Sequence, residues 1–96
     1  MLFQEAEAIL NSHKRALLCL GTRALSLFGS VARNEGTSVS DVDILIDFDS
    51  KKGLFGFVSL KNYLEKLLGR EVDLVTKNAL HPTLKKKILR EAKHVF

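Results

Sequence analysis

The strictest pattern in this chain is the alternation over residues 41–48, DVDILIDF. Apolar residues fill every second position, and three aspartates and a leucine fill the positions between: Val42, Ile44, Ile46 and Phe48 against Asp41, Asp43, Leu45 and Asp47. A period of two predicts a β-strand with one apolar face for a core and one largely acidic face. Because the chain has 96 residues, we expect the strand to belong to one domain that spans residues 1–96.

The rest of the chain predicts helices and further strands around this one. Apolar residues at three- and four-residue steps indicate helices, and short apolar runs between turn residues indicate strands. In chain order we predict a helix over 2–20, a strand over 23–28, a short helix over 31–34, the strand 41–48, a helix over 54–68, a strand over 71–75, a helix from His81 and Pro82 onward, and a terminal strand at 95–96. Ser30 is expected to cap the short helix, and residues 34–40 to form a polar loop. This order predicts an α+β fold (an α/β sandwich), with helices packed on one face of a small mixed sheet.

Composition narrows the expected partners and compartment. The net charge of +4 suits an anionic partner such as a nucleotide or nucleic acid, although many unrelated proteins share it. The one cysteine, Cys19, cannot form an intrachain disulfide, and its leucine neighbours predict a buried side chain. No apolar run approaches the ~20 residues of a membrane span, and the acidic start of the chain is unlike a signal peptide. We therefore expect a cytoplasmic protein that does not contact a membrane.

Asp41 and Asp43 are the first candidates for chemistry. On a strand their side chains point the same way, with backbones about 6.6 Å apart. Two such carboxylates repel each other unless a cation lies between them, and Mg²⁺ prefers oxygen ligands of this kind. Asp73 would project from the same face if its strand lies beside 41–48. The alternative is that these acids decorate a solvent-facing sheet surface.

Gly29 and Ser30 form the second candidate group. A glycine directly after a strand lets the backbone approach a ligand closely, and a helix that begins there offers free N–H groups to an anion. This turn could hold the phosphates of a nucleotide whose metal ions sit on the aspartates. The alternative is an ordinary turn, and the combination with the aspartates favours the phosphate site.

The spacing of these groups resembles a known family. The GS pair at 29–30, followed after ten residues by DVD at 41–43, is similar to the signature of the DNA polymerase β-like nucleotidyltransferase superfamily. Residues 71–75 resemble its third-carboxylate strand. Residues 80–92 resemble the C-terminal helix of the minimal nucleotidyltransferases (MNT), small prokaryotic proteins often paired with a HEPN-domain partner as antitoxin and toxin. The resemblance covers residues 21–96.

The resemblance implies an Mg²⁺-dependent nucleotidyltransferase of polymerase β palm-like fold that moves AMP from ATP to a hydroxyl acceptor. It implies two Mg²⁺ ions, with ATP as the substrate. It assigns nucleotide binding to Gly29, Ser30 and Arg33, and catalysis and metal binding to Asp41, Asp43 and Asp73. The implied acceptor is a tyrosine of a HEPN-domain toxin encoded nearby, so that AMPylation of the toxin would be the antitoxin activity.

The chain departs from the family pattern after the arginine. The family often continues Gly-Ser-x-Ala-Arg-Gly, whereas Asn34 follows Arg33 here, and Gly36 stands where alanine is common. Asparagine tolerates left-handed backbone geometry, so we expect the turn to survive. For Arg33 we expect either contact with phosphate or a steadying effect on the acid cluster, and the alternative is a plain surface ion pair.

Other functions remain open at this point. A catalytically inert module could neutralise a HEPN partner by contact alone, and a transferase of this kind could act on tRNA or a small molecule. So short a chain leaves little room for a separate acceptor-binding domain, so the acceptor surface is expected from a partner or a second copy, in a homodimer or hetero-oligomer. Direct nucleic-acid binding is not expected. The basic residues 85–87, Arg90 and Lys93 are predicted to form a solvated helix face, opposite a buried stripe of Leu84, Ile88 and Ala92.

Overall fold

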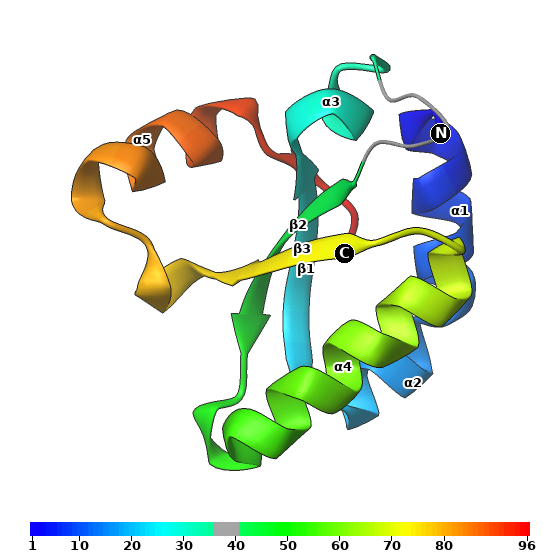
Figure 1. Ribbon diagram of the computed structural model, residues 1–96, viewed down its shortest axis with the longest axis vertical. Coiled ribbons are helices and arrows are strands. Elements are labelled where there is room, and N and C mark those ends of the chain that lie inside the picture. Colours follow the sequence, from blue (N-terminus) through cyan, green and yellow to red (C-terminus); the bar gives the residue numbers. More distant parts are fainter. Residues whose placement is uncertain (36–40) are drawn as a thin grey trace.

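The computed structural model describes residues 1–35 and 41–96 (Figure 1). The helices and strands are, in chain order, α1 (Phe3–Ser12), α2 (Lys14–Cys19), β1 (Thr22–Phe28), α3 (Gly29–Ala32), β2 (Val42–Phe48), α4 (Gly53–Leu68), β3 (Val72–Thr76), α5 (Pro82–Glu91) and β4 (Lys93–His94). Two short 3-10 turns, η1 (Ser50–Lys52) and η2 (Lys77–Ala79), precede α4 and α5. Residues 36–40, which include Gly36 and most of the predicted polar loop, lie outside the described residues.

The four strands form one mixed sheet in the order β3-β2-β1-β4. The strand β2 pairs antiparallel with β1 and parallel with β3, and β4 pairs antiparallel with β1. The pairing with β1 continues past β4, because the N–H of Val95 donates to the carbonyl of Leu25 at 2.9 Å. The alternating segment is therefore a central strand, and the predicted mixed sheet of an α+β fold is confirmed.

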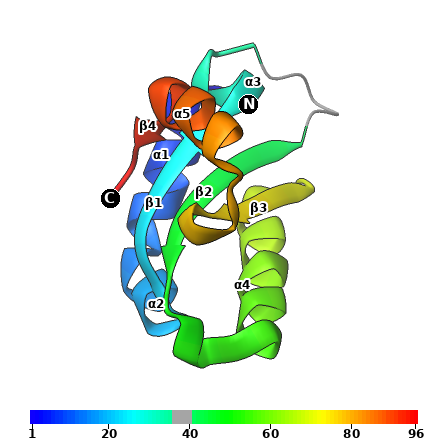
Figure 2. The same cartoon turned by 90° about the vertical axis from the view of Figure 1, so that its left-hand side faces the viewer.

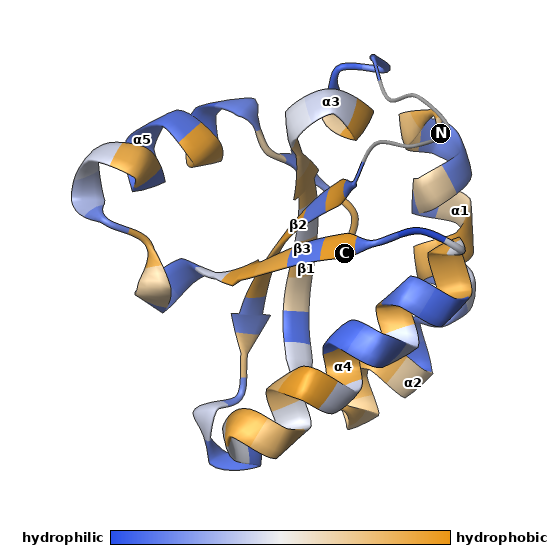
Figure 3. Ribbon diagram, in the orientation of Figure 1, coloured by the Kyte–Doolittle hydropathy of each residue, from blue (hydrophilic) through white to orange (hydrophobic). Residues whose placement is uncertain are grey.

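Helices α1, α2 and α4 cover one face of the sheet, whereas α5 lies on the other side (Figures 1 and 2). The core between the sheet and these three helices is aliphatic, and hydrophobic colours run along the strands (Figure 3). From α4 it takes Leu60, Leu64 and Leu68, whose four-residue spacing puts them on one helix face. Gly69, with φ +65°, ends α4 in the left-handed conformation that suits glycine. Within the described residues, no helix has both the length and the apolar character needed to cross a bilayer.

The prediction of one continuous helix over 2–20 is wrong. The chain leaves helical geometry at His13, where φ is −112° and ψ is +18°, and the two pieces are α1 and α2. The His13 N–H donates to the carbonyl of Leu10, and its Nδ1 lies 3.0 Å from the carbonyl oxygen of Ile9. No glycine or proline lies near this break. The apolar periodicity continues through His13, and it therefore predicted a single helix.

The predicted burial of Cys19 is also wrong. Its side chain is exposed, and the adjacent Leu18 is 45% exposed. In the six-residue helix α2, only Leu17 is buried. Because residues two positions apart on a helix point in different directions, Cys19 faces away from the core that Leu17 enters.

The predicted buried stripe on α5 is wrong as well. No residue of α5 is buried, and Leu84 is 53% exposed. Figure 3 shows hydrophobic and hydrophilic residues alternating along this helix. It contacts α3, while its first turn projects away from the rest of the fold (Figure 1). The helix α5 is amphipathic, as its sequence predicts, but its apolar side is not buried.

Candidate active site

The candidate site lies where the end of β1 meets the beginnings of β2 and β3. In the sheet register Phe28 stands opposite Asp43, and Asp43 stands opposite Asp73. Side chains in register on neighbouring strands lie on the same face of a sheet. The prediction that Asp73 projects beside Asp43 is therefore confirmed. Asp41 lies just before β2 and is exposed.

Asp43 is the electrostatic centre of this group. Partial burial raises the pKa of its carboxyl, and the negative charges of Asp73 and Asp41 and a hydrogen bond with the Asp73 side chain raise it further. The positive charge of Arg33 acts in the opposite direction. The negative charges of Asp73 and Asp41 therefore add to burial in disfavouring the ionised form of Asp43.

Gly29 lies directly against this pair. Its φ is +69°, a conformation that side chains rarely adopt. A Cβ at this position would overlap with Oδ2 of Asp43 and would lie 3.0 Å from its Cγ. The glycine turn and the aspartates, which the sequence placed ten residues apart, therefore form one site.

Ser30 does not cap the helix that follows the turn. The helix α3 begins at Gly29, its N-cap is Phe28, and no side chain caps it. The positive φ of Gly29 turns the chain directly from strand to helix, so Ser30 falls inside the first turn. Val31 and Ala32 are buried and hold α3 on the core. The first N–H groups of a helix have no partner within it, so this turn offers donors beside Asp43.

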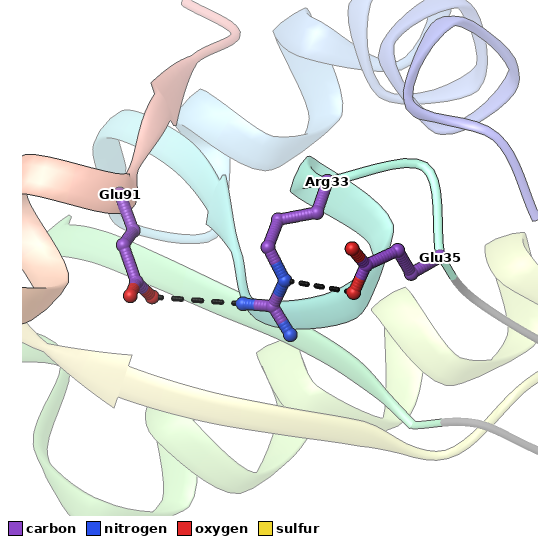
Figure 4. A network of polar contacts seen from close by, with 3 residues as sticks. All are labelled: Arg33, Glu35 and Glu91. Atoms are coloured by element: carbon purple, nitrogen blue, oxygen red, sulfur yellow. Dashed lines mark hydrogen bonds and ion pairs between the residues drawn. The ribbon is translucent and has the colours of Figure 1, made fainter.

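Arg33, at the end of α3, joins the site to α5. Its Nε donates to Oε2 of Glu35 at 3.1 Å, and its Nη1 lies 3.7 Å from Oε2 of Glu91 (Figure 4). The same guanidinium lowers the pKa of Asp43. The ion pair that was one expectation for Arg33 is therefore present, and its charge acts on Asp43, whereas its contact with phosphate stays a prediction.

Asn34 has the left-handed geometry that its sequence suggested. Its φ is +58°, and its Oδ1 accepts a hydrogen bond from the N–H of Phe3 at 2.8 Å. Asparagine therefore supplies the left-handed residue that this turn contains. In addition it binds the first turn of α1, which a glycine could not do.

A cavity of about 430 Å³ opens beside the carboxylates. It is lined by Asp41, Lys61, Glu65, Glu71, Val72 and Asp73. Glu65 of α4 also accepts the N–H of Val72 at 3.0 Å, which ties this helix to the beginning of β3. The space is on the outer-strand side of the site, so a second substrate could reach Asp73 from there.

The donor set suits a magnesium ion, although it is not a closed cage. In the described parts of the chain, no three histidine, cysteine, aspartate or glutamate side chains are grouped tightly enough to enclose an ion. Mg²⁺ is usually bound by one or two carboxylates, with waters and substrate phosphates completing its shell. Asp43 and Asp73, in register on neighbouring strands, provide that number of carboxylates.

Sequence reasoning missed the acids that bind Arg33. Glu35 is two residues away, and a local ion pair could have been proposed for it. Glu91 lies at the far end of α5, and only the packing of α5 against α3 brings it near. The sequence also offered no reason to expect Lys61 in the site, because an exposed lysine on a helix is common. In the structure it lines the cavity.

A mixed sheet with paired carboxylates against a strand–glycine–helix turn is the arrangement of a nucleotidyltransferase. Comparison with protein families agrees, since residues 10–95 match the nucleotidyltransferase domain. The chain belongs to this family of enzymes.

Two relatives cover most of the chain. A protein of Methanocaldococcus jannaschii named "Putative protein adenylyltransferase" is 50% identical over 80 residues, which are 83% of this chain and 86% of the relative. The protein adenylyltransferase MntA of Thermococcus cleftensis is 45% identical over 93 residues, 96% of this chain and 94% of the relative.

Solved structures share the fold. One described as a "putative minimal nucleotidyltransferase" has 37% identity and a TM-score of 0.77, covering 97% of this chain and 95% of the other. A toxin–antitoxin structure with AMP-PNP has 22% identity and a TM-score of 0.72, covering 88% and 71%. A complex of tri-AMPylated Shewanella oneidensis HEPN toxin with MNT antitoxin has 20% identity and a TM-score of 0.70, covering 99% and 72%. At these last identities the likeness concerns the fold alone.

Proposed function

We propose that this enzyme transfers AMP from ATP to a tyrosine of a HEPN-domain toxin, with Mg²⁺, and so acts as an antitoxin. In this proposal residues 1–96 work as one domain in the cytoplasm. The observation that carries the proposal is Asp43, in register with Asp73 and directly against Gly29. This arrangement brings a cation-binding group and a phosphate-binding turn within one substrate's reach.

The nucleotide side of the site is assigned to the turn after β1. The backbone at Gly29 and Ser30 would donate to phosphate oxygens, because Gly29 has no side chain to keep a ligand away from this turn. Arg33 would add a charged donor at the end of α3. Its charge also offsets part of the repulsion among the aspartates.

The carboxylate side is assigned to Asp41, Asp43 and Asp73. They would hold Mg²⁺, which supplies charge stabilisation for the attacking and leaving oxygens when it is bound. Burial and the acidic neighbours disfavour the ionised form of Asp43. A bound cation would offset this repulsion between the carboxylates. The acceptor hydroxyl attacks the α-phosphorus, pyrophosphate leaves, and Asp73 accepts the hydroxyl proton.

The acceptor is assigned from the relatives. Two relatives at 45–50% identity have protein adenylyltransferase in their names, and the Shewanella complex contains a tri-AMPylated toxin with its antitoxin. The cavity beside Asp73 gives an incoming tyrosine a path to the carboxylates. A tRNA or small-molecule acceptor is the alternative, and a chain of 96 residues leaves little room for a separate domain that would bind it.

Intact-mass spectrometry tests the proposal directly. The protein would be mixed with ATP, Mg²⁺ and the product of a neighbouring HEPN reading frame, with Asp41→Asn/Asp43→Asn as the matched inactive control. We expect a mass gain of one or more AMP units on the partner, absent with the double variant. A stable complex without any gain would favour the inert binding module, and transfer by the double variant would overturn the metal assignment.

A further inference from the structure

Glu91 is a charged group through which α5 contacts the site described above. It is the last residue of α5, and its Oε2 lies 3.7 Å from Nη1 of Arg33. Figure 4 shows Glu91 and Arg33 reaching toward each other from α5 and α3. These two helices are in contact, whereas the first turn of α5 projects outward.

Arg33 needs such a contact if it is to have a fixed direction. The helix α3 has four residues, and Arg33 follows as its C-cap, so the helix itself does little to orient the side chain. An unrestrained arginine side chain loses about 2 kcal/mol of rotamer entropy when it is ordered. Contacts already present in the nucleotide-free protein would reduce that loss on binding.

Two acids share this task, and they differ in position. Glu35 follows Arg33 closely in the chain and its side chain is 64% exposed, so it moves with the same turn. Glu91 comes from a separate element, and its side chain is 36% exposed. An ion pair with less exposed partners is less weakened by salt and water. Glu91 therefore restrains the Arg33 side chain from an element outside the turn that carries Arg33.

Both ion pairs leave the guanidinium able to bind an anion. Arginine has five N–H donors, of which Nε carries one and each terminal nitrogen two. In Figure 4 the third nitrogen of Arg33 points away from both carboxylates. Arg33 can therefore donate to a phosphate oxygen while it keeps its contacts with Glu35 and Glu91.

We propose that Glu91 is a positioning residue that holds Arg33 toward the nucleotide turn and thereby makes α5 part of the nucleotide site. This inference rests on the proposed function for the role of Arg33. Glu91 itself touches neither nucleotide nor metal. It acts through the ion pair alone.

The sign of one substitution separates positioning from bulk charge. Glu91→Gln removes a negative charge near a site for an anionic ligand. If Glu91 acted only as a charge, triphosphate binding would become tighter. If Glu91 positions Arg33, binding becomes weaker, by roughly two- to five-fold, as expected for a partly exposed ion pair.

Calorimetric titration of a non-hydrolysable ATP analogue with Mg²⁺ measures this effect. Glu7→Gln on α1 is the matched control, since it makes the same charge change in the other helix layer. We expect weaker binding by Glu91→Gln, unchanged binding by Glu7→Gln, and no added loss when Glu91→Gln is combined with Arg33→Gln. Tighter binding, or an equal loss in both Arg33 backgrounds, overturns the proposal.

A second measurement tests the contact between Glu91 and Arg33 in the absence of nucleotide. The Nη1–H signal of Arg33 in ¹⁵N NMR spectra, from the nitrogen that faces Glu91, should move toward the position of a free arginine in Glu91→Gln but stay in place in Glu7→Gln. An unmoved signal overturns the inference whatever the titrations give. Failure of the wild-type protein to bind the analogue, with a shifted Arg33 signal, overturns the proposed nucleotide role but leaves the Glu91–Arg33 contact established.

Discussion

Gly29 adjoins the carboxylate of Asp43, and this gives two separate reasons for a glycine at this position. Its φ of +69° disfavours any side chain, and a Cβ would overlap with Oδ2 of Asp43. We predict that Gly29→Ala destabilises the protein by about 2–4 kcal/mol in urea unfolding, the sum of backbone strain and overpacking.

Gly53 supplies the matched control for that prediction. Its φ is +68°, but nothing lies within 4 Å of a Cβ built there. Gly53→Ala should therefore cost only the backbone strain, about 1–3 kcal/mol at its φ of +68° and ψ of −171°. Asp43→Ala in the Gly29→Ala background should recover much of the difference. Equal losses for the two alanine variants would show that the Asp43 contact does not matter.

Asp43 also predicts how stability depends on pH. Its pKa is raised above the ordinary value of 3.8, chiefly by burial and then by Asp73 and Asp41. The folded state therefore binds the proton more tightly than the unfolded state does. The stability that this group contributes is fully present below pH 3.8 and is lost as pH rises through the raised pKa.

Urea unfolding of the metal-free protein at a series of pH values checks this sign. Asp43→Asn cannot ionise, so its free energy of unfolding should exceed that of the wild type at neutral pH. The difference should shrink as the pH falls toward 3.8. A variant that is less stable than the wild type at neutral pH, and equally so in acid, would contradict the expected repulsion.

Within α4, two apolar residues should respond very differently to truncation. Leu64 is fully buried in the core, whereas Phe55 in the first turn is 88% exposed. We predict that Leu64→Ala costs about 2–5 kcal/mol of unfolding free energy, and Phe55→Ala less than about 0.5 kcal/mol. Thermal and urea unfolding of both variants measure the contrast. Similar losses would mean that the exposed turn is covered in solution.

The elements that sequence could predict are those with a strong local pattern. The strict alternation of 41–48 identified the strand that lies at the centre of the sheet, and glycine ends both α4 and the segment before β1. The break at His13 has no local signal, and the amphipathic pattern of α5 does not say whether anything covers it. Local patterns report the period of an element but not its neighbours.

In the site, too, local patterns could be predicted from the sequence, whereas contacts between elements could not. Asp43 and Asp73 could be placed together because they share a strand phase, and parallel pairing of β2 and β3 then brings them into register. The close contact between Gly29 and Asp43, which leaves no room for a Cβ at residue 29, could not be foreseen. It depends on the register between β1 and β2. Glu91 was missed for a related reason, because its position depends on how the last helix returns to α3.

For the whole molecule, ligand binding should appear as added stability. If Mg²⁺ and nucleotide bind the folded state alone, the gain is about 2.7 kcal/mol at a hundred times the dissociation constant. We predict a rise in melting temperature of the wild type with ATP and Mg²⁺ together, measured by scanning calorimetry. Asp43→Asn/Asp73→Asn should show no such rise. An equal rise in that variant would place the ligand elsewhere on the molecule.

The hydrogen bond from the Phe3 N–H to Asn34 makes the Phe3 amide a spectroscopic probe of the turn that follows Arg33. Phe3 belongs to the helix layer, yet its amide is bound to the residue that follows Arg33. Any rearrangement of that turn when a nucleotide arrives must alter this amide's chemical shift and its exchange with deuterium. A single backbone signal near the start of the chain can therefore report, in real time, whether the site is engaged.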